Sequence, residues 1–191
     1  FNNYTKLNDT VVALWAKILN HVSDSRLYLK ANQFEDQTVR EEVIQRFLVY
    51  GIDAKRITLE GFDSREKYFL AYQHVDIALD PFPFTGGTTT VEALWMGVPV
   101  LTLEGNSLVS RQGVGILINA GLPNWIAKNQ NDYLAKAISF TTDLDKLALL
   151  RLGLRKRVLD SPLFDAVRFS KNLENALWKM WQQQNSTLKS G

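Results

Sequence analysis

Four short apolar runs, separated by segments of helical periodicity, constrain this fold more than any other feature of the sequence. The runs cover residues 26–30, 56–60, 75–79 and 98–102, and each predicts a β-strand. The last two are apolar along almost their whole length, which is typical of strands covered on both faces. Strands that alternate with helices at this spacing predict βαβ units, so we expect a Rossmann-like α/β domain with a parallel sheet.

Helices are predicted between and after these strands. The spacing of apolar residues places them over 11–22, 35–50, 64–72, 91–96, 109–120, 130–140, 143–158 and 164–184. The last four follow the fourth strand and predict a helical C-terminal extension. A length of 191 residues suits one domain or slightly more. We expect this domain to occupy residues 1–186 and residues 187–191 to form a flexible tail.

Charge and composition exclude several classes of protein. A net charge of +2, with the basic residues dispersed, argues against a nucleic-acid partner. No apolar run reaches the roughly 18 residues of a membrane-spanning helix, so we expect no membrane segment. The absence of cysteine excludes disulfides, thiolate metal sites and a cysteine nucleophile. The two histidines, His21 and His74, are interpreted as structural, so we expect neither a metal site nor a metal cofactor.

The segment after the third apolar run contains the strongest chemical signal. Ligands of open α/β sheets bind beyond the carboxyl ends of the strands, often at a helix N-terminus. Gly86 and Gly87 allow the backbone to approach an anion, and Thr88 and Thr89 add hydroxyl donors at the start of the next helix. A diphosphate fits these donors, and Glu92, about one turn on, suits ribose hydroxyls. Gly-Gly-Thr is also an ordinary entry into a helix, and Thr89-x-x-Glu92 fits a capping box, so both interpretations stay open.

Two further segments are candidates for the same edge of the sheet. Near the start of the chain, Lys6 offers a point charge to a phosphate, and Asn3 and Thr5 offer hydrogen bonds. The simpler interpretation of Lys6 is a solvated lysine near a chain terminus. The segment 62–65 follows the second strand, but its Asp and Ser also suit a helix cap. No nucleophile and base pair follows from the residues, which indicates that a catalytic base would come from elsewhere.

Longer motifs resemble a known family. The runs DIALDPFPFTGGTTTVEALWMGVPVLTLEG, SLVSR, AGL, IAKNQNDY and SPLF, with the opening FNNYTKLND, resemble the C-terminal catalytic region of glycosyltransferase family 41. This family contains the O-GlcNAc transferases and the SPINDLY-type O-fucosyltransferases. The resemblance implies one lobe of a two-lobed GT-B enzyme, usually found behind tetratricopeptide repeats. It also implies a cytoplasmic, inverting transferase that moves a sugar from a nucleotide-sugar to protein Ser/Thr, without a metal.

The resemblance implies roles for individual residues. Lys6 matches the lysine that steadies the leaving diphosphate, and Asn3 a neighbouring amide. Gly87, Thr88 and Thr89 match the helix N-terminus that grips the diphosphate, and Glu92 an acid that binds the ribose. The loop and helix around the base contain four matches: Phe62, Asp63, Arg65 and Tyr68.

Some positions differ from the O-GlcNAc transferases. Those enzymes have a histidine at Gly87, and a histidine and an arginine at Tyr68 and Ala71. The opening and the GGTTT run resemble SPINDLY-type sequences more closely, so UDP-GlcNAc and GDP-fucose both stay open as donors. We further expect Phe1 to mark the end of the lobe's first strand and catalysis to need an N-terminal lobe, so that this fragment alone is inactive. The alternative is a non-catalytic nucleotide-binding or scaffold module of a repeat protein.

Overall fold

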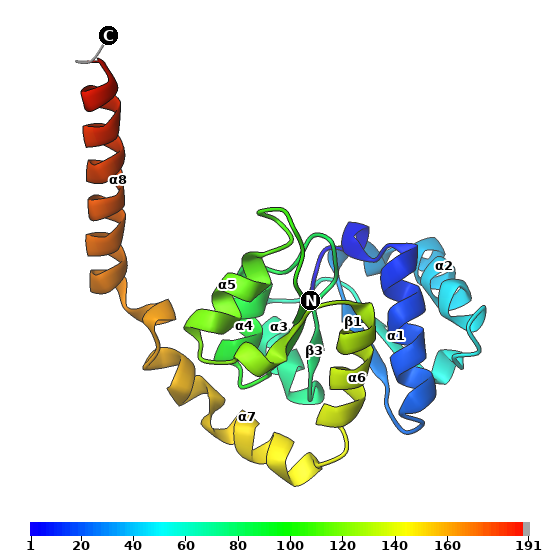
Figure 1. The fold of residues 1–191 in the computed structure, drawn as a ribbon. Coiled ribbons are helices and arrows are strands. Elements are labelled where there is room, and N and C mark those ends of the chain that lie inside the picture. The colour runs from blue at the N-terminus through cyan, green and yellow to red at the C-terminus, as the bar shows by residue number, and fades with distance from the viewer. Residues whose placement is uncertain (189–191) are drawn as a thin grey trace.

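The computed structural model describes residues 1–188 as an α/β body from which a long C-terminal helix projects (Figure 1). Five strands form the sheet region: β1 (Leu27–Lys30), β2 (Ile57–Glu60), β3 (Ala78–Leu79), β4 (Val100–Leu103) and β5 (Ile126–Ala127). Every pairing is parallel, as predicted. The fifth strand was not expected, because Ile126–Ala127 does not lie in a long apolar run, whereas the two residues of β3 lie at the end of the run 75–79.

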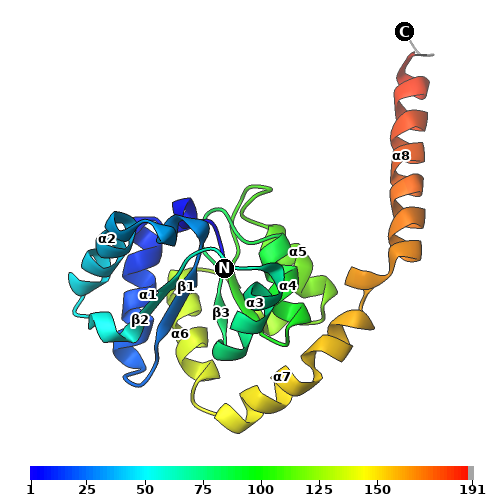
Figure 2. The same ribbon diagram turned by 180° about the vertical axis from the view of Figure 1, so that it is seen from behind.

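The strands form two separate sheets in the described part of the chain. One sheet contains β1 and β2, in which Leu27 lies opposite Ile57. The other has the order β3-β4-β5, in which Ala78 lies opposite Val100. Figures 1 and 2, from opposite sides, both draw β1 and β3 as neighbours with the N-terminus above them.

Helices of the predicted kind connect and cover the strands, and they carry the predicted helical C-terminal region. Their bounds are α1 (Asp9–His21), α2 (Gln37–Leu48), α3 (Arg65–Leu70), α4 (Thr88–Trp95), α5 (Gln112–Asn119), α6 (Gln130–Phe140), α7 (Leu144–Leu159) and α8 (Ala166–Leu188). Short 3-10 turns lie between them, including one at Tyr4–Lys6. Residues 187 and 188 continue α8, and residues 189–191 of the expected tail lie outside the described residues.

Helix α1 shows how the sequence specifies these elements. The Asn8 side chain accepts a hydrogen bond from the Val11 backbone N–H and caps the helix. The apolar face of α1 is then buried completely at Val11 and almost completely at Leu14 and Leu19. The core continues through fully buried side chains of the other elements, which include Phe47, Leu94, Leu101, Leu117 and Tyr133.

Two helix starts differ by three residues from the sequence-based prediction, more than any other start. Helix α4 begins at Thr88 instead of residue 91, with Gly87 as its N-cap and no side-chain cap. The capping-box interpretation of Thr89 is therefore wrong, because Thr89 lies inside the first turn. Helix α5 begins at Gln112 instead of residue 109. Ser110 donates its hydroxyl to the Ser107 carbonyl, which holds the preceding residues in a turn.

Helix α8 has a different environment from the rest of the fold. It stands away from the body in both views (Figures 1 and 2). Large apolar side chains along it are exposed, and Trp178 and Trp181 stack on each other with ring centroids 4.9 Å apart. Across residues 1–188, no helix combines the length and the apolar character that crossing a membrane requires.

Candidate functional site

Asp80 organises the glycine-rich loop after β3. Its side chain is 2% exposed and accepts hydrogen bonds from the Gly86 backbone N–H at 2.6 Å and from the Thr102 hydroxyl at 2.7 Å. Burial raises the pKa of Asp80 to about 6, although these two hydrogen bonds oppose the rise. The Tyr133 hydroxyl donates to the Asp80 carbonyl at 3.1 Å. The loop is thus tied at its base to β4 and α6.

Lys6 lies against this loop although 79 residues separate the two in sequence. Its ammonium donates to the Thr85 carbonyl and to the Asn2 side-chain oxygen, each at 3.1 Å. Burial lowers the pKa of Lys6, and the charge of Asp80 partly opposes that change. Lys6 is therefore not the freely solvated lysine of the simpler interpretation. The Asn8 amide also donates to the Phe82 carbonyl at 2.6 Å, which holds the N-terminal segment on the loop.

The N-terminus of α4 faces the same segment. The Thr89 hydroxyl donates to the Asn2 side-chain oxygen at 3.2 Å. The first N–H groups of a helix have no acceptor within the helix, and the helix dipole makes this end positive. Lys6 and this helix end thus place positive charge on one edge of the sheet, a natural binding region for an anion.

A pocket of about 540 Å³ lies beside this edge, between the N-terminal segment, β1, the loop after β2 and α3. Six residues predicted for the site line it: Asn3, Phe62, Asp63, Arg65, Tyr68 and Glu92. Phe62 is 70% exposed, so its ring is available to a ligand. The Tyr68 hydroxyl donates to a Glu92 carboxylate oxygen at 2.9 Å, and burial raises the pKa of Tyr68 to about 12.

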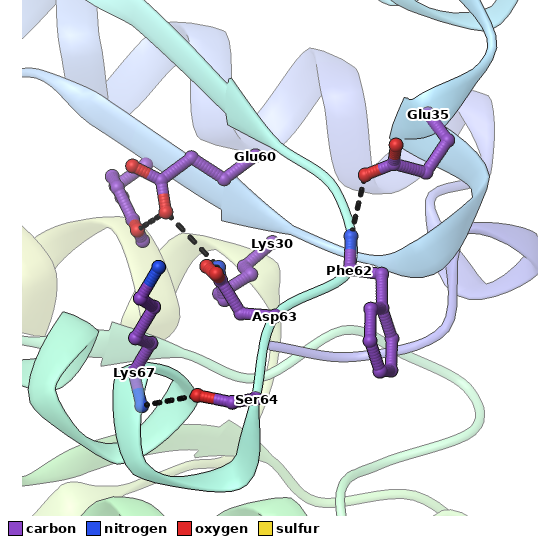
Figure 3. A network of polar contacts seen from close by, with 8 residues as sticks. Lys30, Glu35, Glu60, Phe62, Asp63, Ser64 and Lys67 are labelled. Carbon is purple, nitrogen blue, oxygen red and sulfur yellow. Dashed lines mark hydrogen bonds and ion pairs between the residues drawn. The ribbon is translucent and has the colours of Figure 1, made fainter.

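An ion-pair network forms the wall of this pocket (Figure 3). The Lys30 ammonium, whose side chain is 2% exposed, lies 2.5 Å from an Asp63 oxygen and 3.0 Å from a Glu60 oxygen. Glu60 also accepts a hydrogen bond from the Tyr28 hydroxyl. The hydrogen bond from Lys30 lowers the pKa of Asp63, so its carboxylate stays ionised at neutral pH. Glu35 fixes the loop from the other side, because it accepts a hydrogen bond from the Phe62 backbone N–H at 2.7 Å.

The remaining predicted residues take less direct positions. Thr5 donates its hydroxyl to the Asn3 side-chain oxygen at 2.9 Å and does not line the pocket. Gly86, Gly87 and Thr88 lie at the start of α4, also outside the lining. Gly86 is buried, and a Cβ atom there would lie 2.5 Å from the Thr90 hydroxyl. Any larger residue at this position would therefore require the neighbouring side chains or the loop to shift.

Sequence reasoning missed three residues of the site: Asn2, Lys30 and Asp80. Asp80 and Lys30 each stand at the carboxyl end of an apolar run, and a charged residue there is a signal that was available. Asn2 carries no comparable signal, because its role depends on contacts with Lys6 and Thr89. Within residues 1–188, no cluster of three or more His, Asp or Glu side chains is arranged to hold a metal ion.

A parallel α/β domain with a positive helix end, a lysine and a polar pocket on the carboxyl edge of its strands is typical of nucleotide-binding domains. The model of glycosyl transferase family 41 matches residues 1–173, and the chain belongs to this family. The resemblance seen in the sequence is thereby confirmed.

Known relatives agree with this assignment. The chain is 36% identical over 184 residues to a probable UDP-N-acetylglucosamine–peptide N-acetylglucosaminyltransferase SPINDLY from Solanum lycopersicum, covering 96% of this chain and 20% of the relative. It is 30% identical to a UDP-N-acetylglucosamine–peptide N-acetylglucosaminyltransferase from Caenorhabditis elegans, covering 97% and 16%. A solved structure of an O-GlcNAc transferase variant from Thermobaculum terrenum matches with a TM-score of 0.89 and 34% identity, covering 96% of this chain and 35% of that one. The chain thus spans about a fifth or less of these curated relatives and corresponds to one part of the O-GlcNAc transferase structure.

Proposed function

We propose that this chain is the donor-binding lobe of an inverting protein O-glycosyltransferase. In this proposal the lobe holds a nucleotide-sugar and stabilises the diphosphate that leaves when the sugar is transferred to a Ser/Thr hydroxyl. The main observation in support of the proposal is the contact between Lys6 and the loop before α4. The Lys6 ammonium donates a hydrogen bond to the Thr85 carbonyl at 3.1 Å. Two distant segments thereby present positive charge to one place beside the pocket.

The chemistry of the transfer fits these charges. As the bond from the sugar to the diphosphate breaks, negative charge develops on the departing phosphate oxygens. A preorganised ammonium and a helix N-terminus stabilise this charge without having to reorganise. Lys6 is suited to this, because Asn2 and Thr85 already hold its ammonium in place. In this proposal the base and the sugar of the donor bind in and around the 540 Å³ pocket, and its lining residues Glu92 and Tyr68 lie near the ribose.

Several parts of the proposal lie outside the chain. A catalytic base would come from an N-terminal lobe, and the acceptor would be a separate protein. Tetratricopeptide repeats are a further proposed partner within the complete protein. We accordingly propose that this lobe, without an N-terminal lobe, binds the donor but transfers no sugar. The names of the relatives favour UDP-GlcNAc as a donor. The differences at Gly87, Tyr68 and Ala71 leave GDP-fucose as the alternative.

The proposal is tested first by Lys6→Met in a complete enzyme that contains this lobe. We expect kcat/KM for sugar transfer to fall by about 100-fold or more, the typical cost of losing one stabilising donor. Lys55→Met is the matched control, because Lys55 is exposed and lies before β2, at the opposite edge of the sheet. A change of less than about twofold for Lys6→Met would overturn the electrostatic role.

Titration calorimetry of the chain with UDP and with GDP is the second test. Binding of one of them is expected, and the preferred nucleotide then selects the donor class. If neither binds at millimolar concentration, the donor-binding role is wrong and the alternative of a non-catalytic scaffold module is favoured. If a complete enzyme binds a donor but transfers no sugar from any nucleotide-sugar in a panel, the lobe is a nucleotide-binding module.

A further inference from the structure

The loop before α4 contains two phenylalanine rings in opposite environments. Phe82 is 7% exposed, and its ring packs against Tyr133 with the ring centroids 6.1 Å apart. Phe84, two residues further on, is 48% exposed. The hydrophobic core of residues 1–188 includes Phe82 but not Phe84. Burial of apolar surface therefore does not account for the position of the Phe84 ring.

The Lys6 ammonium lies over the face of this exposed ring. Lys6 Nζ is 4.2 Å from the centroid of the Phe84 ring. The face of an aromatic ring attracts a cation through its quadrupole. The same ammonium donates hydrogen bonds to the Asn2 side-chain oxygen and to the Thr85 carbonyl. Two oxygens and one ring face thus surround the ammonium.

The backbone that carries the Phe84 ring is held firmly by its neighbour Thr85. Thr85 is completely buried, and its backbone N–H and its hydroxyl donate to the Val109 carbonyl at 3.2 and 3.0 Å. The Thr85 hydroxyl also accepts a hydrogen bond from the Gly113 N–H at 3.2 Å. The ring is therefore attached to a fixed point of the loop, whereas a lysine side chain is a flexible four-carbon stem.

A ring face suits an ammonium that must bind an anion. A carboxylate in contact with Lys6 would cancel its charge, whereas a neutral ring attracts the ammonium and leaves its net charge unchanged. An ammonium has three N–H donors, and Asn2 and Thr85 accept from two of them, so one is left for a phosphate oxygen. Burial lowers the pKa of Lys6, and a ring face opposes this effect because it favours the charged form.

We propose that Phe84 is a positioning residue for sugar transfer, whose ring holds the Lys6 ammonium in place for the leaving diphosphate. This inference rests on the function proposed for Lys6 and adds a residue that acts through it. The competing role for an exposed ring at this edge is direct contact with the donor. The two roles differ in one respect that can be measured, because only the first requires Lys6.

Kinetics of a complete enzyme that contains this lobe test the proposal. Phe84→Leu keeps an apolar side chain but removes the ring face. We expect kcat to fall about fivefold, because cation–π attraction at a half-exposed site corresponds to roughly a two- to tenfold change. KM for the donor should stay within about twofold, since the charge that Lys6 stabilises develops in the transition state. Phe84→Tyr retains a ring face and should restore kcat to within about twofold of the parent.

Phe164→Leu is the matched control for losing a ring. Phe164 is 36% exposed, and its ring lies 5.4 Å from that of Trp95, the last residue of α4. The control therefore removes a ring of similar exposure from the end of α4 that is remote from Lys6. We expect its kcat to stay within about twofold of the parent. An equal loss of kcat in Phe164→Leu and Phe84→Leu would overturn the proposal.

The double variant Lys6→Met with Phe84→Leu separates the two roles of the ring. Because Phe84 acts through Lys6, adding Phe84→Leu to Lys6→Met should change kcat by less than about twofold. A further fivefold loss, or a raised KM, would overturn the proposal and assign the ring to direct contact with the donor. A large loss in Lys6→Met without a loss in Phe84→Leu overturns this inference alone. No loss in either variant overturns the function proposed for Lys6, and this inference with it.

Proton NMR of the chain itself tests the contact without the reaction. Protons over the face of an aromatic ring are shielded by its ring current, so the ε-methylene protons of Lys6 should resonate upfield of those of the exposed Lys55. The upfield shift should disappear in Phe84→Leu and persist in Phe84→Tyr. If the Lys6 protons of the parent resonate with those of Lys55, the ring does not hold the ammonium and the proposal is wrong.

Discussion

Gly86→Ala tests whether the glycine-rich loop is held in one conformation by the residues around it. A Cβ atom at this position would lie 2.5 Å from the Thr90 hydroxyl, 2.8 Å from the Thr89 hydroxyl and 3.0 Å from an Asp80 oxygen. Ordinary carbon contacts are about 3.5–4.0 Å, so the loop or the first turn of α4 must move. Thr90 and Asp80 are each 2% exposed, and moving Asp80 would disturb the hydrogen bonds that it accepts from the Gly86 N–H and the Thr102 hydroxyl.

The size of the effect follows from this crowding. Forcing a methyl group into a well-packed site costs about 1–3 kcal/mol. For a chain of this length, 1 kcal/mol corresponds to roughly 2–4 °C in melting temperature, so a cost of about 2 kcal/mol, the middle of that range, gives an expected decrease of about 4–8 °C for Gly86→Ala. Displacing α4 also displaces its N-terminus, and we expect the affinity for a bound nucleoside diphosphate to fall about tenfold or more.

Gly115→Ala is the matched control for this measurement. Gly115 lies inside α5, and nothing lies within 4 Å of a Cβ atom built there. Alanine is the better helix former by about 1 kcal/mol, so this variant should be as stable as the parent or slightly more stable. Thermal melting and calorimetric titration of both variants make the comparison. If Gly86→Ala melts and binds like Gly115→Ala, the argument from loop crowding is wrong.

Two further predictions concern charged groups. Lys30→Met leaves Asp63 and Glu60 without their cation, but both carboxylates are partly exposed, so we expect a loss of about 2 kcal/mol in urea unfolding at pH 7. Because the pKa values of Glu60 and Asp63 are lowered in the fold from 4.5 and 3.8, this loss should begin to shrink as the pH falls below about 4 and should vanish only below their lowered folded values. Lys67→Met, at an exposed lysine, should cost less than about 0.5 kcal/mol. A difference that persists unchanged at pH 3 would contradict the ion-pair explanation. Burial raises the pKa of Asp80 from 3.8 to about 6, so its ionised form destabilises the fold above that pH, and the penalty fades as the pH falls from 6 towards 4. The parent therefore gains stability as the pH is lowered from 7.5 to 4.5, whereas Asp80→Asn does not. The melting temperature of Asp80→Asn minus that of the parent should fall over this change in pH, and a rise would refute the raised pKa of Asp80.

Most of the fold could be predicted from local patterns in the sequence. The apolar runs placed four of the five strands, and the caps and apolar spacing placed the helices, because both signals depend on neighbouring residues. The boundaries failed where a local contact competed with the helix. The Ser107 and Ser110 turn delays α5, and Gly87 allows α4 to start early without any side-chain cap. The residues of the pocket wall were predicted only in part, since Lys30 acquires its partners by folding against the loop after β2.

The sequence by itself determined the class of fold, an α/β domain with parallel strands. It also determined which functional groups are available to a ligand: a Gly/Thr-rich helix N-terminus and a lysine near the start. Only the tertiary structure decided which of these groups meet. Lys6 and Thr85 are 79 residues apart, and their contact exists because parallel strands bring all their carboxyl ends to one edge. The same is true of Asp80, whose burial between the loop and β4 sets its pKa. Periodicity is a property of neighbours in sequence, whereas burial and charge pairing are properties of neighbours in space.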